Sequence, residues 1–361
     1  MKRRRILMGI LITAVVLMLG YGGAYLASED VRYLTRAGLE QIEILRKRRP
    51  IEKVIADPAL DDRTRDFLRL VLDTRTHAAA IGLDAGDTYT QFTDIGRDTL
   101  LLVLSASPKD CICPHTWKYP IVGRIPYKGF FDPAMARREQ EKLAARGMDT
   151  YLRPAAAYST LGWFEDPLLS TALVRDSVEL ASLVFHEIAH NSIYVKSATP
   201  FNESFAQLVG YRAAEEFFRG RGDSALADRA SDRWHDEIVL AGFYNELVGR
   251  LERFYATRPA PDSLEAGRVE AGRWVREQLE GPVGAQLRVM RVNRMIERPI
   301  NNAALVGVRL YRTNLPWFDR WYVQHGSNVR ASVEAMRELM KGAEGDTAFA
   351  RLERAVGDSA R

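Results

Sequence analysis

A short apolar stretch carrying two histidines restricts the fold of this chain more than any other segment. Residues 183–193 read L-V-F-H-E-I-A-H-N-S-I, which places His186, Glu187 and His190 in the order H-E-x-x-H. Residues four apart share a helix face, so both imidazoles can bind one metal ion. Glu187 lies about 100° round the helix, where its carboxylate can act as a general base without being a ligand. The apolar flanks predict a buried helix.

Glu203 is the predicted third ligand, because a catalytic zinc ion usually has three protein ligands and leaves the fourth position to water. Twelve residues lie between His190 and Glu203. That length allows the helix to end near Val195, the chain to turn, and a second helix to run back toward the metal. Asn202 or Thr199 is expected to cap this second helix.

Two other interpretations of these histidines fit less well. The longer pattern H-E-x-x-H-x-x-G-x-x-H is absent, because Ile193 and Lys196 stand at its glycine and third histidine positions. A pair of solvated histidines on a surface helix does not suit so apolar a run.

Zinc suits two imidazoles and one carboxylate, and manganese, cobalt and iron remain alternatives. Asn202 and Asn191 are candidates for orienting the ligands through hydrogen bonds.

The N-terminal segment predicts a membrane anchor or a signal peptide. The 22 residues 6–27 contain no charged side chain, and the basic cluster of residues 2–5 precedes them. At about 1.5 Å per residue this length spans a bilayer core of about 30 Å. Small residues at Gly22-Gly23-Ala24 also suit a cleaved signal. Both interpretations place the chain after about residue 28 outside the cytoplasm, and an anchoring helix is the slightly favoured one.

Composition indicates one large domain behind this segment. The chain has 361 residues, 47% of them hydrophobic, and no low-complexity linker. We expect a single catalytic domain over residues 28–345 and a flexible tail over residues 346–361. The net charge of +4 is mild and comes partly from the N-terminal cluster, so no nucleic-acid partner is expected.

The pattern of the domain predicts a predominantly helical α+β fold, with a small sheet packed on the H-E-x-x-H helix. The apolar run 99–105 predicts a buried strand, and Asp132-Pro133 is expected to start a helix that Gly147 closes.

The two cysteines, Cys111 and Cys113, are interpreted as ordinary thiols or a reducible pair, with a small disulfide or a second metal site with His115 as alternatives.

The block around the two histidines, residues 171–206, resembles the signature of a bacterial family of predicted aminopeptidases. That family belongs with the H-E-x-x-H…E zinc peptidases of the gluzincin type. Three further segments, 117–131, 157–167 and 301–311, are similar to it, so the resemblance covers nearly the whole chain after the N-terminal segment. One departure is that family members often carry a lipoprotein cysteine after the apolar segment, and this chain has none there.

The resemblance implies a substrate strand and an oxyanion donor. In zinc peptidases of this type a peptide commonly lies along an edge strand above the active-site helix. Ala157, Tyr158, Ser159 and Thr160 are short or polar, so we expect the substrate there. Tyr311 is the predicted donor to the oxyanion. The alternative donors are Tyr158, Tyr244 and Tyr322.

Together these features predict a zinc-dependent aminopeptidase with one zinc ion per chain and a peptide substrate. Glu187 would act as general base toward a metal-activated water. The expected location is the extracytoplasmic side of the bacterial cell envelope. A zinc endopeptidase or another amide hydrolase with the same site is an alternative, and a non-catalytic binding protein is a weaker one, since it would need no Glu187.

Overall fold

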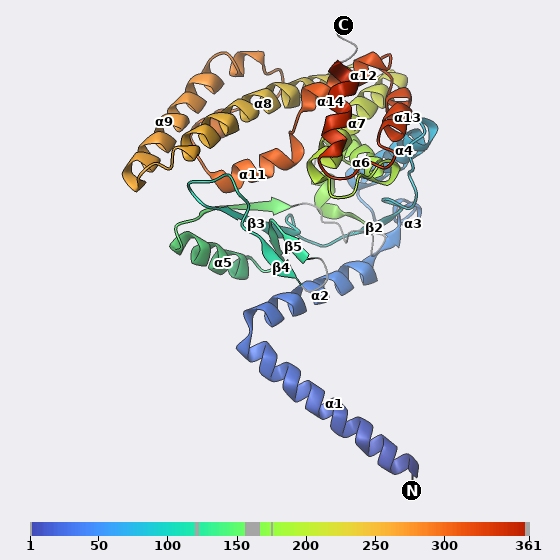
Figure 1. The fold of residues 1–361 in the computed structure, drawn as a ribbon. Helices are drawn as coiled ribbons and strands as arrows, with labels where there is room; N and C mark the ends of the chain where they lie inside the picture. The colour runs from blue at the N-terminus through green and yellow to red at the C-terminus, as the bar shows by residue number, and fades with distance from the viewer. Residues whose placement is uncertain (1, 120–122, 156–166, 175, 358–361) are drawn as a thin grey trace.

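The computed structural model describes residues 2–119, 123–155, 167–174 and 176–357, and it is a predominantly helical α+β fold (Figure 1). The helices are α1 (Lys2–Ala27), α2 (Glu29–Lys47), α3 (Ile51–Ile55), α4 (Asp62–Ala80), α5 (Pro133–Ala145), α6 (Ser177–Ser192), α7 (Thr199–Gly220), α8 (Ser224–Ala256), α9 (Pro261–Glu280), α10 (Asn293–Ile296), α11 (Asn302–Tyr311), α12 (Leu315–Gln324), α13 (Val329–Leu339) and α14 (Thr347–Gly357), with the 3-10 turns η1 (Ser170–Val174) and η2 (Gly284–Gln286). The strands are β1 (Arg49–Pro50), β2 (Gln91–Thr93), β3 (Leu101–Ser107), β4 (Trp117–Tyr119), β5 (Gly123–Ile125), β6 (Lys128–Phe130), β7 (Asp149–Ala155) and β8 (Leu168–Leu169).

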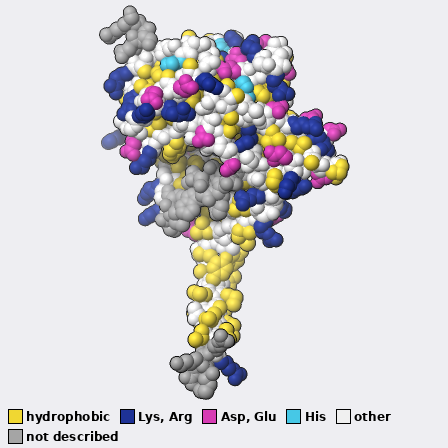
Figure 2. Space-filling view, turned by 90° about the vertical axis from the view of Figure 1, so that its right-hand side faces the viewer, with side chains coloured by type: hydrophobic (Ala, Val, Ile, Leu, Met, Phe, Trp, Pro, Cys, Tyr) yellow, Lys and Arg dark blue, Asp and Glu magenta, His cyan; other side chains and the backbone are white. Residues whose placement is uncertain are grey.

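Helix α1 projects away from the rest of the molecule (Figure 1). Its apolar side chains form an exposed stalk in the space-filling view (Figure 2). Residues 6–27 are long and apolar enough to cross a membrane, and a signal sequence near the N-terminus passes the same test. Helix α2 begins directly afterwards at a serine cap, where the Ser28 hydroxyl accepts a hydrogen bond from the Val31 amide at 3.3 Å. The predicted apolar N-terminal helix is therefore present.

The helices α6 and α7 form the centre of the main core, and α4 and α8 pack beside them. The ring of the fully buried Phe185 on α6 lies 6.2 Å from that of Phe217 on α7, and Phe201 and Phe205 of α7 pack against Phe318 of α12. The short sheet β1-β2-β8 shares the same core through Phe92 and Leu168. Burying such large side chains accounts for much of the stabilisation of this helix pair.

The second sheet has the order β6-β3-β7, with both neighbours antiparallel to β3. The strand predicted over 99–105 corresponds to β3, displaced by two residues. Helix α5 packs on one face of this sheet and α11 on the other (Figure 1). Asp132 caps α5 as predicted, accepting hydrogen bonds from the amides of Ala134 and Met135. This sheet reaches the α6–α7 pair through α11.

The prediction of a loose tail is wrong for residues 347–357, which form α14. Ala348, Leu352 and Val356 are four residues apart and all buried in the main core. The ring of Phe349 lies 5.5 Å from that of Phe201, centroid to centroid. Charged residues lie between these positions, so the segment is an amphipathic helix. Its apolar face packs on the main core.

Candidate metal centre

The orientation of helix α6, and with it the direction of its two histidines, is fixed by a cap at its start and by the burial of its apolar face. The carboxylate of Asp176 accepts a hydrogen bond from the Glu179 amide at 3.0 Å and so caps the helix. From there the apolar residues of α6 turn into the core, and the helix ends when Ile193 becomes extended. His186 and His190 are one turn apart on the side that faces α7.

A short turn brings the chain back into α7. Ser197 adopts a positive φ of 59°, and Pro200 lies in the first turn of the new helix. The side-chain oxygen of the buried Asn202 accepts from the Val195 amide at 2.9 Å, and its amide nitrogen donates to the Val195 carbonyl at 2.8 Å. The expectation that Thr199 or Asn202 caps this helix is wrong, because the cap position is Ala198. Asn202 instead ties the turn to the helix at the residue before Glu203.

The three predicted ligands converge in this geometry. The Nε2 atoms of His186 and His190 lie 3.2 Å apart. Oε2 of Glu203 lies 3.3 Å from Nε2 of His186, and Oε1 lies 3.8 Å from Nε2 of His190. All three ligand atoms are within 4.8 Å of one another, and the two imidazole rings are nearly perpendicular at 85°. Two nitrogens and one carboxylate oxygen around a common point are the donor set of a catalytic zinc site.

The electrostatics favour the forms of these residues that bind a metal. The pKa of His190 is lowered to about 4, chiefly by burial and then by the neighbouring charge of His186, against the opposing effect of Glu203. Burial raises the pKa of Glu203, but the hydrogen bond and charge of His186, and then His190, outweigh it and leave this pKa below its ordinary value. Near neutral pH, His190 is therefore neutral and Glu203 ionised, as metal binding requires.

Gly210 allows the two helices to approach this closely. It follows Glu203 by seven residues, two turns along the same face of α7. A Cβ at this position would lie 2.9 Å from the carbonyl oxygen of Ser182 and 3.5 Å from Cβ of His186. Sequence reasoning missed this residue, although a glycine inside the helical run L-V-G-Y is a signal of close helix packing.

Tyr311 lies close enough to the candidate metal ligands to interact with the charge of Glu203 and, more weakly, with that of Glu187. The pKa of Tyr311 is raised to about 12, chiefly by burial and then by the charges of Glu203 and, more weakly, Glu187. The phenol therefore keeps its proton and can donate a hydrogen bond. Tyr127, which the sequence did not single out, is 44% exposed, but partial burial and then the charge of Glu203 raise its pKa as well. Both tyrosines are thus candidate donors at the site.

A buried ion pair fixes the end of α11 that carries Tyr311. The guanidinium of Arg312 donates two hydrogen bonds to the carboxylate of Glu237 on α8, at 2.6 and 3.0 Å. The Glu237 side chain is 5% exposed and that of Arg312 is 24% exposed. Such a bidentate pair fixes both distance and direction. It holds the backbone next to Tyr311 against α8.

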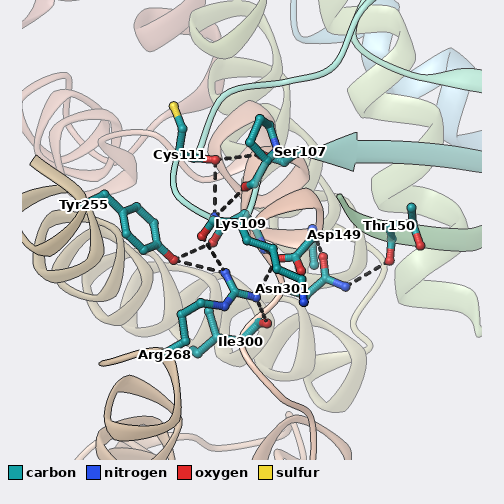
Figure 3. Close-up of polar contacts among 12 residues, drawn as sticks. Ser107, Lys109, Cys111, Asp149, Thr150, Tyr255, Arg268, Ile300 and Asn301 are labelled. Carbon is teal, nitrogen blue, oxygen red and sulfur yellow. Dashed lines mark hydrogen bonds and ion pairs between the residues drawn. The ribbon is translucent and has the colours of Figure 1, made fainter. Parts of the chain in front are cut away.

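A polar network fixes the other end of α11 (Figure 3). One carboxylate oxygen of Asp149 accepts hydrogen bonds from the Asn302 amide and from Arg268, both at 2.7 Å. The Asn302 side chain donates to the carbonyl of Lys109 at 3.0 Å, and Arg268 donates to the same carbonyl at 3.0 Å. Helix α11 is therefore attached at both ends to β7, α8, α9 and the 107–113 loop.

Cys111 and Cys113, in that loop, form a disulfide.

Other predicted site residues lie apart from the triad or outside the described chain. The Asn191 side chain donates to Thr88 Oγ1 at 2.7 Å and holds the 84–88 loop. The hydroxyl of Tyr322 donates to Glu216 at 3.4 Å, and Tyr244 packs beside Arg312. The expected substrate strand, Ala157 to Thr160 with the alternative donor Tyr158, lies outside the described residues.

A comparison with protein families gives one match. A family model described as "Putative aminopeptidase" matches residues 32–348, which is most of the chain. No curated protein and no solved structure matches this chain.

Proposed function

This chain belongs to the family described as "Putative aminopeptidase", and from that premise we propose that it is a zinc-dependent aminopeptidase of the H-E-x-x-H…E type. The observation that carries the proposal is the convergence of Nε2 of His186, Nε2 of His190 and the carboxylate of Glu203 within 4.8 Å of one another. Glu187 follows the first of these residues on the same helix, in the position of a general base.

The donor set fits a zinc ion. Two imidazoles and one carboxylate on two rigid helices suit zinc, with manganese, cobalt and iron as the competing metals. His190 and Glu203 are already in their metal-binding protonation forms near neutral pH. When bound, the ion would supply activation of a water molecule and polarisation of the scissile carbonyl.

Two side chains of the protein carry out the remaining steps: Glu187 transfers the proton, and Tyr311 stabilises the negative charge. Glu187 takes a proton from the attacking water and passes it to the departing amine. The phenolic hydroxyl of Tyr311 donates a hydrogen bond to the carbonyl oxygen as negative charge develops there, and it keeps its proton. Because α11 is attached at both ends, the hydroxyl is held in place before the substrate arrives, which lowers the reorganisation cost.

The N-terminal helix supports a location at the cell envelope. Residues 6–27 can cross a membrane by length and composition, and a basic cluster precedes them. By the positive-inside rule this arrangement puts the catalytic domain outside the cytoplasm, whether the helix is an anchor or a signal.

A peptide set with free and acetylated amino termini tests the reaction. The metal content of the purified chain is measured first, and each peptide is then incubated with it. An aminopeptidase releases single residues from free-amine peptides and leaves the acetylated ones intact. Internal cuts in both sets would instead establish an endopeptidase with the same site. A bound metal without any cleavage would contradict a peptidase function toward these sequences.

A further inference from the structure

Arg153 lies on the face of β7 that α11 covers. Side chains along a strand alternate between its two faces. On one face, Thr150 accepts a hydrogen bond from Gln140 of α5, and Leu152 packs in the cluster that α5 covers. On the other face, Asp149 binds the first amide of α11. Arg153 is four residues after Asp149, so its side chain leaves β7 toward α11.

This arginine has no protein partner in the described chain, although it is half-buried. The structure gives it no hydrogen bond or ion pair with any of the described residues. Other arginines of the domain interior behave differently. Arg212, Arg268 and Arg312 each donate to a carboxylate, at 2.8, 2.7 and 2.6 Å. A half-buried guanidinium that meets no anion among the described residues is open to pairing with an anionic group from outside them.

The charge of Arg153 acts on both candidate hydroxyl donors beside the metal centre. It opposes the rise in the pKa of both Tyr127 and Tyr311, the two hydroxyls on which Glu203 acts. The two carboxylates at the site, Glu187 and Glu203, would together balance the charge of a bound divalent ion. Arg153 therefore adds a positive charge that no carboxylate of the described residues pairs with, on the side of the sheet that carries α11 and Tyr311.

We propose that Arg153 binds a carboxylate group of the substrate. The inference rests on the proposed peptidase function and adds a substrate class to it: peptides that carry an acidic group close to the scissile bond. The chemistry matches, because a guanidinium offers a planar fork of donors that pairs with both oxygens of a carboxylate. The acidic group is either an Asp or Glu side chain or the C-terminal carboxylate of a short peptide.

Two peptide series distinguish these sources. The first varies one side chain next to the scissile bond among Glu, Gln and Lys. The second compares a free C-terminal carboxylate with its amide in dipeptides and tripeptides. We expect kcat/KM of the wild-type chain to be about 10- to 100-fold higher for the acidic member of one series. Equal values across both series would overturn the proposal.

Arg153→Gln should remove this preference, mainly by raising KM for the acidic peptide to the level of its neutral counterpart. Arg153→Lys keeps the charge and should retain part of it. The matched control is Arg137→Gln, which removes one charge from an exposed position of α5 on the other face of the sheet. If Arg153→Gln kept the full preference, or if the control lost it as well, the carboxylate would be recognised elsewhere.

A binding measurement separates this proposal from the hydrolytic one. The Glu187→Gln chain is titrated with the acidic peptide and its neutral counterpart, with Arg153 intact and with Arg153→Gln. Tighter binding of the acidic peptide that disappears with Arg153→Gln supports the proposal even if no peptide is cleaved. Hydrolysis of neutral peptides without any such difference would leave the peptidase function standing and refute the role of Arg153.

Discussion

A Cβ on Gly210 would lie 2.9 Å from the carbonyl oxygen of Ser182 and 2.9 Å from its hydroxyl oxygen. No side chain fits between α7 and α6 at this level, so the two backbones are in direct contact. The same Cβ would lie 3.5 Å from Cβ of His186. The spacing between His186 on one helix and Glu203 on the other therefore depends on a residue that offers no ligand and no charge.

Gly210→Ala should separate the helices and weaken both stability and metal binding. We expect a loss of about 1 to 3 kcal/mol in the free energy of unfolding, because an inserted methyl has no space. Denaturant unfolding of the metal-free chain and competition with a zinc chelator measure the two effects. The control is Gly242→Ala on α8, where nothing lies within 4 Å. That change should stabilise by about 0.5 to 1 kcal/mol, and an equal loss in both variants would refute the close-contact explanation.

The Arg312–Glu237 pair should matter for turnover as well as for stability. Glu237→Gln leaves a mostly buried guanidinium without its counter-charge, at a cost of about 2 to 3 kcal/mol. It should also lower kcat, because the backbone beside Tyr311 loses its attachment.

Glu252→Gln is the matched control for that pair. Arg309–Glu252 also joins α11 to α8, but both its side chains are 49% exposed, so this change should cost at most about 1 kcal/mol. The readouts are urea unfolding and steady-state kinetics. If Glu237→Gln destabilised the chain but left kcat at the wild-type value in the folded fraction, the pair would have no role in positioning Tyr311.

Tyr311→Phe should lower kcat about 100-fold or more and change KM little, as expected for a donor that acts in the transition state. Metal content should stay at the wild-type level, since Tyr311 is not a ligand. Tyr127→Phe, measured beside it, should cost less. The reverse order of the two effects would assign the donor role to Tyr127.

The metal-free chain should become less stable as the pH falls from 7 to 5. The pKa of His190 is about 4 in the folded chain, below its ordinary value of 6.5. The unfolded chain therefore binds a proton in this range that the folded chain excludes, and stability present above pH 6.5 is lost toward pH 4. The loss from His190 is about 2 kcal/mol between pH 7 and 5.

Unfolding in a chelator at the two pH values measures that loss. His190→Gln should reduce it, whereas His235→Gln, on α8, should leave it unchanged. An unaltered loss in His190→Gln would mean that another group causes the destabilisation.

The helix with H-E-x-x-H and the return to Glu203 could be predicted from the sequence, because their signals are local. Four-residue spacing fixes a helix face, and an apolar run with a capping aspartate fixes a buried helix. The strand β3 and the helix α5 follow from equally local patterns.

The remaining features depend on contacts between distant segments. Tyr127 lies just before β6 and Arg153 lies on β7, and only the tertiary fold brings both close enough to act on Tyr311 of α11. The partner of Asn202 is the backbone of Val195, which no side-chain pattern indicates. The high charge of the C-terminal segment favoured a flexible tail. The four-residue spacing of Ala348, Leu352 and Val356, which is typical of an amphipathic helix, was therefore not recognised as α14. Gly210 carried a signal, a glycine inside a helix, but its partner Ser182 is visible only in the structure.

The central claim is that Glu187 acts beside a metal held by His186, His190 and Glu203, and one measurement tests it most directly. Bound metal and peptide hydrolysis are determined on the same preparations of the wild-type chain, Glu187→Gln and His190→Ala. The account predicts about one metal ion per chain in the first two, hydrolysis only in the wild type, and neither metal nor hydrolysis in His190→Ala. Hydrolysis by Glu187→Gln at the wild-type rate, or full metal content in His190→Ala, would contradict it.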